Sequence, residues 1–147
     1  MQKISIGSDH GGYELKLTVK EILEKRGYEI HDMGCNSPES CDYPDYGFAV
    51  ANEVSSGKSD KGILICKSGI GMSIVANKVK DIRAALCYTA ESAGFSRMHN
   101  DANILVMGSK YVKPEVAEDI LFAFLNTEFE GGRHTKRVDK IKLKESC

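Results

Sequence analysis

The stretch Gly62-Ile63-Leu64-Ile65-Cys66-Lys67-Ser68-Gly69-Ile70-Gly71-Met72 decides the fold. Its first five residues form a continuous apolar run, which is typical of a strand buried on both faces of a parallel sheet. A loop with two glycines follows at once, and the pattern predicts a helix that begins near Met72. A buried strand that passes through a short loop into a helix is half of a βαβ unit, the building block of α/β proteins.

The same alternation of strands and helices extends to both ends of the chain. We expect further strands at 3–7, 28–33, 82–88 and 104–108, and helices at 12–26, 48–54, 90–98 and from Pro114 onward. Residues 34–44 are polar and are predicted to form an ordered loop. No repeat, low-complexity tract or linker interrupts this pattern. The sequence therefore predicts a single α/β domain over residues 1–147.

The charge balance excludes several classes of partner. Twenty basic and 21 acidic residues give a formal net charge of −1, so no overall field attracts nucleic acid or an anionic membrane. No apolar run approaches the roughly 20 residues that a membrane-spanning helix needs. We therefore expect a cytoplasmic protein with no nucleic-acid or membrane partner, and a local basic cluster for any small anionic ligand.

The five cysteines are predicted to be reduced thiols, because they are scattered and contain no C-x-x-C pair. Cys35 and Cys41 near His31 suggest zinc at first sight, but structural zinc sites usually have more tightly paired ligands. The same missing pair weakens the alternative of a thiol-redox module. We expect neither a metal nor a cofactor.

Cys66 and the loop after it form the first candidate site. In open α/β sheets, ligands bind beyond the carboxyl ends of the strands. The glycines after Cys66 allow several backbone N–H groups to converge, which stabilises an anion and favours the thiolate. The alternative is an inert buried thiol. The dinucleotide fingerprint would need glycine at Ile74, and cysteine phosphatases have arginine where Met72 stands, so both are disfavoured.

Three more groups are candidates at the same edge. Asp9-His10 follows the first strand, and is either an N-cap with an exposed histidine or a carboxylate and an imidazole that bind substrate. His99-Asn100 ends a predicted helix, where both residues also suit a purely structural role. Arg133 and Arg137 share one face if their segment is helical, and form either a solvated face or a bidentate phosphate site.

Together these groups resemble the ribose-5-phosphate isomerase B family, which also includes galactose-6-phosphate and allose-6-phosphate isomerases. The resemblance spans essentially the whole chain. The motifs that carry it are Gly7–Gly12, Asp42–Pro44, Gly62–Cys66, Ser68–Gly71, Ala76–Lys78, Ser96-Arg97, His99–Asn103, Gly131–His134 and Arg137. The resemblance implies a Rossmann-like, three-layer αβα sandwich with a five-stranded parallel sheet. It also implies a homodimer or homotetramer whose sites combine residues of two subunits.

The family resemblance also implies an activity and residue roles. The activity is interconversion of ribose 5-phosphate and ribulose 5-phosphate through an enediolate, an intramolecular oxidoreduction without a cofactor or metal. Cys66 would move the proton between C2 and C1 with help from Ser68, and His99, supported by Asp9, would open the furanose ring. The residues implied to bind the phosphorylated sugar are Asp9, His10, Tyr43, Lys67, Ser68, Gly69, Ile70, Gly71, Asn100, Lys110, Arg133 and Arg137.

Two positions depart from the family pattern and leave alternatives open. Lys67 stands where the family usually has glycine, and Lys110 where many relatives have arginine. One alternative is an isomerase of allose or galactose 6-phosphate. Another is a non-catalytic phosphosugar-binding subunit, against which the presence of both Cys66 and His99 argues.

Overall fold

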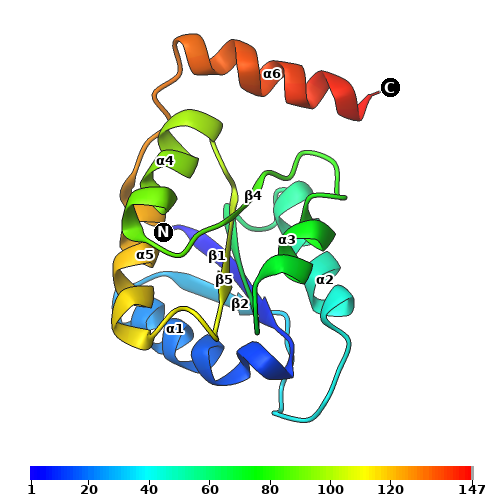
Figure 1. The fold of residues 1–147 in the computed structure, drawn as a ribbon, viewed down its shortest axis with the longest axis vertical. Coiled ribbons are helices and arrows are strands. Elements are labelled where there is room, and N and C mark those ends of the chain that lie inside the picture. The colour runs from blue at the N-terminus through cyan, green and yellow to red at the C-terminus, as the bar shows by residue number, and fades with distance from the viewer. Residues whose placement is uncertain (147) are drawn as a thin grey trace.

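A five-stranded parallel sheet forms the centre of the protein in the computed structural model, which describes residues 1–146. The strands lie in the order β2-β1-β3-β5-β4 (Figure 1). All four pairings between neighbouring strands are parallel. The strands are β1 (Lys3–Ser8), β2 (Glu29–Asp32), β3 (Lys61–Cys66), β4 (Ala84–Leu86) and β5 (Ile104–Gly108). The predicted three-layer αβα sandwich is therefore confirmed.

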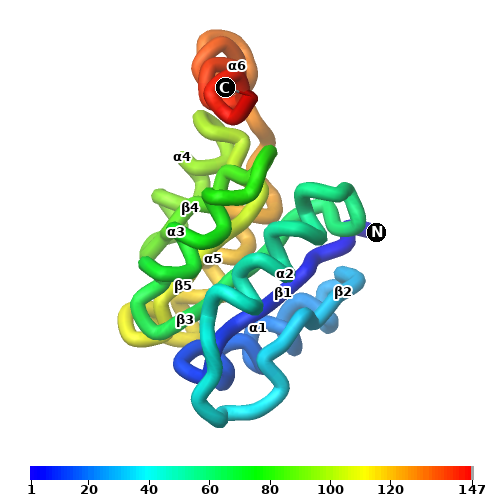
Figure 2. Tube along the Cα trace, turned by 90° about the vertical axis from the view of Figure 1, so that its right-hand side faces the viewer, coloured from blue at the N-terminus to red at the C-terminus, as the bar shows by residue number. Residues whose placement is uncertain are grey.

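Helices cover both faces of the sheet. Helices α1 (Tyr13–Lys25), α4 (Ala90–Asn100) and α5 (Pro114–Asn126) pack on one face, and α2 (Tyr43–Ser55) and α3 (Ile70–Ala76) on the other (Figure 1). Both layers follow from right-handed crossovers between parallel strands. The last helix, α6 (Arg133–Glu145), lies across the end of the sandwich beside the end of α4 (Figure 2).

The core has two halves, one on each side of the sheet. Alternate residues of β3 enter different halves: Ile63 and Ile65 face α1 and α5, whereas Leu64 faces α2 and α3. All three side chains are fully buried. Burial of one such side chain contributes about 1.5–3 kcal/mol, so the central strands supply much of the driving force for folding. The continuous apolar run of β3 therefore reflects burial on both faces, as the sequence predicted.

Several predicted boundaries differ from the structure. Helix α2 begins at Tyr43 rather than Phe48, because Pro44 fits its first turn, where the missing N–H costs nothing. Helix α3 begins at Ile70 rather than Met72. The edge strand β4 spans only Ala84–Leu86 of the expected 82–88, and α4 extends two residues beyond the predicted Met98. The position of Cys147 lies outside the described residues.

Within residues 1–146, no helix is long and apolar enough to cross a membrane.

Candidate active site

Cys66 ends β3 beneath a loop that curls back over its sulfur. The Gly69 N–H donates a hydrogen bond to Sγ of Cys66 (3.2 Å), and only 5 % of Cys66 is exposed. Gly69 adopts a left-handed conformation (φ +81°), and a Cβ there would overlap the Leu86 side chain, so only glycine fits. The loop therefore brings one backbone N–H group onto the Cys66 sulfur.

Neighbouring hydrogen bonds fix the position of this loop. The N–H groups of Ser109 and Lys110 donate to the carbonyl groups of Cys66 and Lys67, both at 2.9 Å. The Ile70 N–H donates to Oγ of Ser68 (3.2 Å). The loop carbonyls thus face β5, and Lys110 is held beside the loop that follows Cys66.

Asp9 and His10 lie at the same edge of the sheet. Asp9 caps the short 3₁₀ turn His10–Gly12 by accepting a hydrogen bond from the Gly12 N–H (3.1 Å), and its side chain is buried. The Cys41 N–H donates to Nδ1 of His10 (3.2 Å). Because Nδ1 accepts this bond, the ring proton of neutral His10 sits on Nε2, which is left to donate to a ligand.

Tyr43 reaches this edge from the start of α2. Its ring lies against Gly71, where an added Cβ would come within 2.8 Å of two ring carbons. The side chain of Tyr43 is 40 % exposed. We call the group formed by Asp9, His10, Tyr43, residues 66–71 and Lys110 the thiol end of the molecule.

The other predicted site residues lie at the opposite edge. His99 and Asn100 form the last turn of α4, which runs back from the end of β4 to the start of β5. The Gly62 N–H donates to the carbonyl of Asn103 (3.0 Å), so this segment lies beside the first residues of β3. Cys66 is four residues further along that strand, about 13 Å away. The expectation that all four groups gather beyond the carboxyl ends of the strands is wrong, because a crossover helix ends at the amino edge.

Helix α6 adds cationic side chains to this second edge. Residues 133–137 are helical, so Arg133 and Arg137 are one turn apart and share a face, as the conditional prediction stated. Both side chains are exposed. We call His99, Asn100, Arg133 and Arg137, with Glu130 and His134 beside them, the histidine end.

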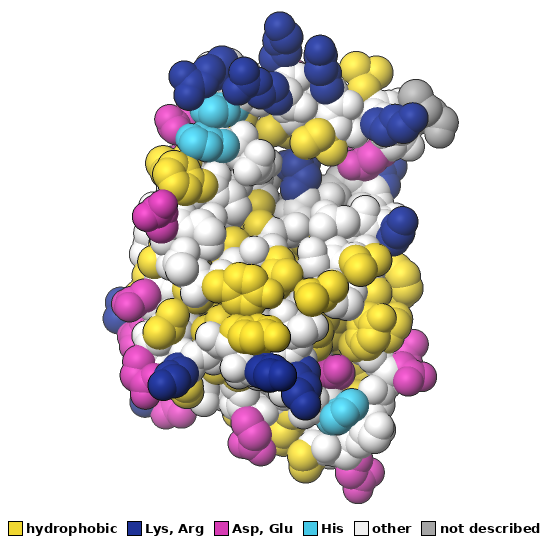
Figure 3. Space-filling model, in the orientation of Figure 1, with side chains coloured by type: hydrophobic (Ala, Val, Ile, Leu, Met, Phe, Trp, Pro, Cys, Tyr) yellow, Lys and Arg dark blue, Asp and Glu magenta, His cyan; other side chains and the backbone are white. Residues whose placement is uncertain are grey.

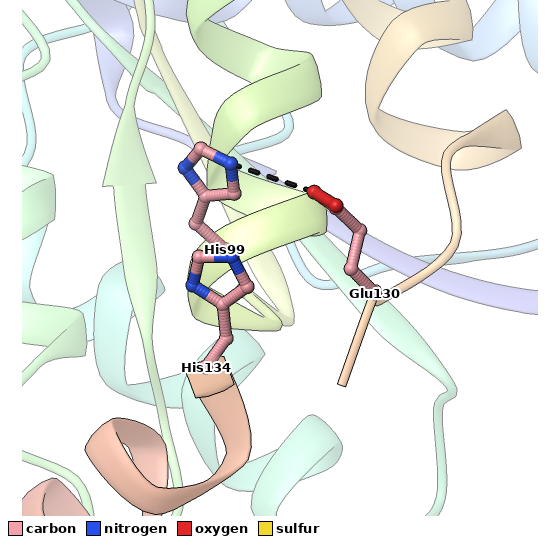
Figure 4. Close-up of side chains that lie close together, drawn as sticks. All are labelled: His99, Glu130 and His134. Carbon is pink, nitrogen blue, oxygen red and sulfur yellow. Dashed lines mark ion pairs between the residues drawn. The ribbon is translucent and has the colours of Figure 1, made fainter. Parts of the chain in front are cut away.

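His99 contacts two of these neighbours (Figure 4). Its Nε2 lies 3.5 Å from Oε1 of Glu130, and its ring stacks on that of His134 with centroids 4.4 Å apart and planes at 13°. Burial, the nearby charge of His99 and that of Arg133 lower the pKa of His134. His134 lies in a motif that the sequence singled out, but was given no role. Glu130 had no signal in the sequence.

Cys35, Cys41 and His31, the residues of the rejected zinc site, have other contacts. His31 lies between Glu29 (3.1 Å) and Glu53 (3.5 Å). The Sγ of Cys35 lies 3.3 Å from the carbonyl oxygen of Ser37, and burial raises the pKa of the Cys41 thiol. Cys35, Cys41, Cys66 and Cys87 are free thiols.

The fold and the site define an α/β protein whose thiol and glycine loop lie at the carboxyl edge of the sheet, where open α/β folds bind small ligands. The Ribose/Galactose Isomerase family matches residues 4–141. Ribose-5-phosphate isomerase B of Escherichia coli is 48 % identical to this chain over 141 residues, 96 % of this chain and 95 % of the relative. A solved Clostridium thermocellum ribose-5-phosphate isomerase B is 53 % identical with a TM-score of 0.97, covering 98 % and 97 % of the two chains.

A third similar protein was solved with a ligand. Ribose-5-phosphate isomerase B from Mycoplasma genitalium, with bound ribulose 5-phosphate, is 40 % identical with a TM-score of 0.94, covering 98 % of this chain and 96 % of that one. These matches show the family. The chain belongs to the Ribose/Galactose Isomerase family.

Proposed function

We propose that this protein is an aldose–ketose isomerase that interconverts ribose 5-phosphate and ribulose 5-phosphate through an enediolate. The observation that carries the proposal is the Cys66 sulfur beneath the loop 67–71, beside Asp9, His10 and Tyr43. The relatives' names and the ribulose 5-phosphate bound to one of them support the choice of a pentose phosphate. The reaction belongs to pentose phosphate metabolism and needs no cofactor.

The residues of the two ends divide the reaction between them. His99 relays the proton of the C1 hydroxyl to the furanose ring oxygen, so that the bond between C1 and the ring oxygen breaks and the aldehyde forms. The Cys66 thiolate then takes the proton from C2, and the electron pair moves to the C1 oxygen, which gives the enediolate. The thiol returns the proton to C1, while the Ser68 hydroxyl relays a proton between the two oxygens. The product is the ketose, and Cys66 is again a thiolate.

Stabilisation of the enediolate comes from the loop. Backbone N–H groups that are fixed before the reaction stabilise a developing oxyanion by about 3 kcal/mol each. The Lys67 side chain adds a positive charge at the same loop. The base itself contributes a factor of roughly a hundred to ten thousand. Stabilisation of the enediolate and proton transfer by Cys66 together lower the barrier to isomerisation of the open sugar.

Binding of the substrate phosphate requires the arginines of the histidine end. Arg133 and Arg137 lie one helical turn apart, and guanidinium groups bind phosphate through paired hydrogen bonds. His10 donates from the other edge through its free Nε2. Because the edges lie roughly 13 Å apart within one chain, the complete site needs residues of two chains.

We propose that a second copy of this chain completes the site. A twofold axis makes each contact reciprocal, so the histidine end of one copy faces the thiol end of the other, and two equal sites form. Exposed apolar side chains at and beside the thiol end support this arrangement: Ile70, Ile74, Tyr88 and Tyr111. Figure 3 shows hydrophobic side chains gathered across the middle of one face, below the cationic side chains of the α6 region. A dimer, alone or paired into a tetramer, buries them.

The site also fits a reducing compartment. A thiol base has to stay unoxidised, and the cytoplasm keeps thiols reduced. We therefore assign the protein to the cytoplasm, with residues 1–147 acting as a single domain.

The direct test of activity is proton NMR of the purified protein with ribose 5-phosphate in heavy water. An isomerase produces ribulose 5-phosphate and incorporates deuterium at the carbon next to the carbonyl. A subunit that only binds the sugar produces neither signal, which would refute the proposal. The same assay with allose and galactose 6-phosphates separates the pentose from the hexose alternatives.

Subunit complementation tests the shared site. The variants Cys66→Ala and His99→Asn are each expected to keep about 1 % of native activity or less, and are then mixed and allowed to exchange subunits. A mixed dimer contains one intact site of two, so random exchange restores about a quarter of the native activity. The matched control pairs Cys66→Ala with Asp9→Asn, which lie at the same end and should restore nothing. Complementation by the control pair, or none by the first pair, would contradict the shared site.

A further inference from the structure

The histidine end holds a set of donor atoms that isomerisation does not require as a set. His99, Glu130 and His134 each offer one ligand atom, and these atoms all lie within 4.8 Å of one another. Across residues 1–146 they form the one group of three or more His, Cys, Asp or Glu side chains with this spacing. In Figure 4 the two rings lie one above the other, and the Glu130 carboxylate points toward them.

We propose that His99, Glu130 and His134 bind a divalent transition-metal ion such as Zn²⁺, and that the bound ion inhibits the enzyme. Two imidazoles and one carboxylate are a donor set that zinc uses in proteins when its fourth position stays open to water or a ligand. The binding site stands on the geometry alone. The inhibitory effect rests on the ring-opening role that the proposed function gives to His99.

The distances suit such an ion after a small adjustment. Ligand atoms about 2.0–2.1 Å from a tetrahedral ion are about 3.4 Å from one another. His99 Nε2 and Glu130 Oε1 already lie 3.5 Å apart. The two imidazole planes, now 13° apart, have to tilt so that their lone pairs converge on one point. The half-exposed Glu130 side chain is able to rotate toward them.

Backbone hydrogen bonds hold the three ligands in place before any ion arrives. The Glu130 N–H donates to the carbonyl of Met98 (3.1 Å), which fixes Glu130 beside the last turn of α4. The His134 N–H donates to the carbonyl of Gly131 (3.0 Å), and the His134 side chain is buried. The backbone therefore needs little reordering when the ion binds, and the main cost is to fix the half-exposed Glu130 side chain.

Nearby charges limit the affinity. The positive charges of Arg133 and Arg137 act on His134, and Glu130 supplies the one negative ligand. Repulsion by two guanidinium groups opposes a divalent cation. We therefore expect micromolar rather than nanomolar dissociation constants, and an ion that exchanges rather than a permanent structural metal.

Inhibition is expected because metal coordination and ring opening would use the same lone pair on a ring nitrogen of His99. A ring nitrogen of His99 that coordinates the ion is no longer able to exchange a proton with the sugar. The cyclic substrate then stays closed, although the thiol end is unaltered. The ion would act as a reversible inhibitor that blocks the step before proton abstraction.

The binding test is a titration of the full-length protein with Co²⁺, followed by its visible absorption. We expect about one equivalent per chain, because three ligands form one site. Glu130→Gln and His134→Gln should weaken binding at least roughly tenfold, as expected for the loss of one ligand from a metal site. His31→Gln is the matched control, since His31 also lies between carboxylates but has no second imidazole, and it should bind as the native protein does.

The spectrum recorded in the titration also distinguishes cobalt bound at this site from cobalt bound by cysteines. Thiolate ligands give cobalt an intense near-ultraviolet band that imidazole and carboxylate ligands lack, so its appearance would overturn the assignment. Binding that is unchanged in Glu130→Gln would overturn it as well. Because Glu130 is half exposed, this variant is expected to fold even if His134→Gln does not.

The inhibition test compares turnover of ribose 5-phosphate with and without Zn²⁺, within each variant. We expect turnover to fall as the site fills, to recover with EDTA, and to be less sensitive to Zn²⁺ in Glu130→Gln. Binding without inhibition would refute the inhibitory effect and count against the ring-opening role of His99. An active enzyme that binds no ion would refute the metal site and leave the isomerase proposal intact.

Discussion

The thiol end and the histidine end are built in different ways. At the thiol end, backbone hydrogen bonds fix the site: Ser109 and Lys110, just after β5, hold the carbonyl groups of Cys66 and Lys67, and Cys66 is nearly closed off from solvent. At the histidine end, side chains project from the tips of α4 and α6, and most of them are exposed. The comparison teaches that the proposed base is fixed by a central strand and the loop after it, whereas the arginines proposed to bind the phosphate project from the first turn of a helix.

Replacement of Cys66, at the thiol end, should have the largest effect on activity. Cys66→Ala removes the base, and we expect kcat to fall roughly a thousandfold or more, with substrate binding retained because the phosphate is held elsewhere. The measurement is turnover by NMR together with calorimetry of ribose 5-phosphate. Cys87→Ala, which removes another buried thiol, is the control and should keep its activity. Full turnover by Cys66→Ala would eliminate the proposed base.

Replacement of His99 separates the ring-opening step from proton abstraction. His99→Asn should lower kcat/KM for ribose 5-phosphate by about a hundredfold, the lower range for loss of an acid–base group. An aldotetrose 4-phosphate has no free hydroxyl at C4 with which to form a furanose, so its isomerisation should change far less. Kinetics with both substrates check the difference. Equal losses on the two substrates would mean that His99 does not act on the ring.

The buried ion pair beneath the thiol end is expected to govern stability. Lys16 is 1 % exposed, and its Nζ donates to Oδ1 of Asp32 (2.7 Å) and to the carbonyl of Cys35. Burial alone would raise the pKa of Asp32, but the hydrogen bonds from Lys16 and the Gly34 N–H, with Lys20 nearby, hold this pKa below its usual value. Asp32→Asn leaves a buried ammonium group without a counter-charge and should cost about 3 kcal/mol at pH 7.

The pH dependence of this effect has a definite sign. Asp32 has a lowered pKa in the folded protein, so its contribution is present above the unfolded pKa of about 3.9 and disappears as the pH falls through the folded value. Urea unfolding at pH 7 and at acidic pH measures both quantities. Glu21→Gln, in the exposed pair with Lys25, is the control and should leave the midpoint unchanged. A cost for Asp32→Asn that persists at the acid end would contradict the ion-pair explanation.

The smallest expected effect concerns Lys67, at the loop itself. Lys67→Gln removes an exposed charge near the reacting carbons, and we expect about a threefold lower kcat that shrinks with added salt, because screening weakens exposed charges. Lys67→Gly removes the bulk of the side chain as well as its charge. The difference in kcat between the Gln and Gly variants therefore measures the effect of side-chain size. Turnover of pentose and hexose phosphates in both variants measures it. Identical kinetics in native and variant proteins would leave Lys67 without a role.

Much of the fold could be predicted from local patterns. The bounds of β5 were predicted residue for residue, and those of β3 to within one, because both are continuous apolar runs buried on two faces. The start of α2 was missed because Tyr43 and Pro44 follow a polar loop, and sequence composition does not distinguish the end of such a loop from the first turn of a helix. Boundaries set by capping are weaker signals than burial.

The arrangement of the candidate residues could be predicted only in part. The groups of the thiol end gather at one edge as expected. The position of His99 at the other edge was also available in principle, since a crossover helix has to return to the amino edge of a parallel sheet. The approach of Glu130 and His134 was not, because it depends on how the segment before α6 turns back onto α4.

The place of helix α6 in the sequence also determines when the proposed phosphate site is able to form during protein synthesis. The arginines of α6 follow all five strands in the sequence, so during translation the ribosome releases them after the whole sheet. Under the proposed roles, a nascent chain forms its sulfur loop before it is able to bind a phosphate. A product truncated before α6 is therefore expected to lack isomerase activity.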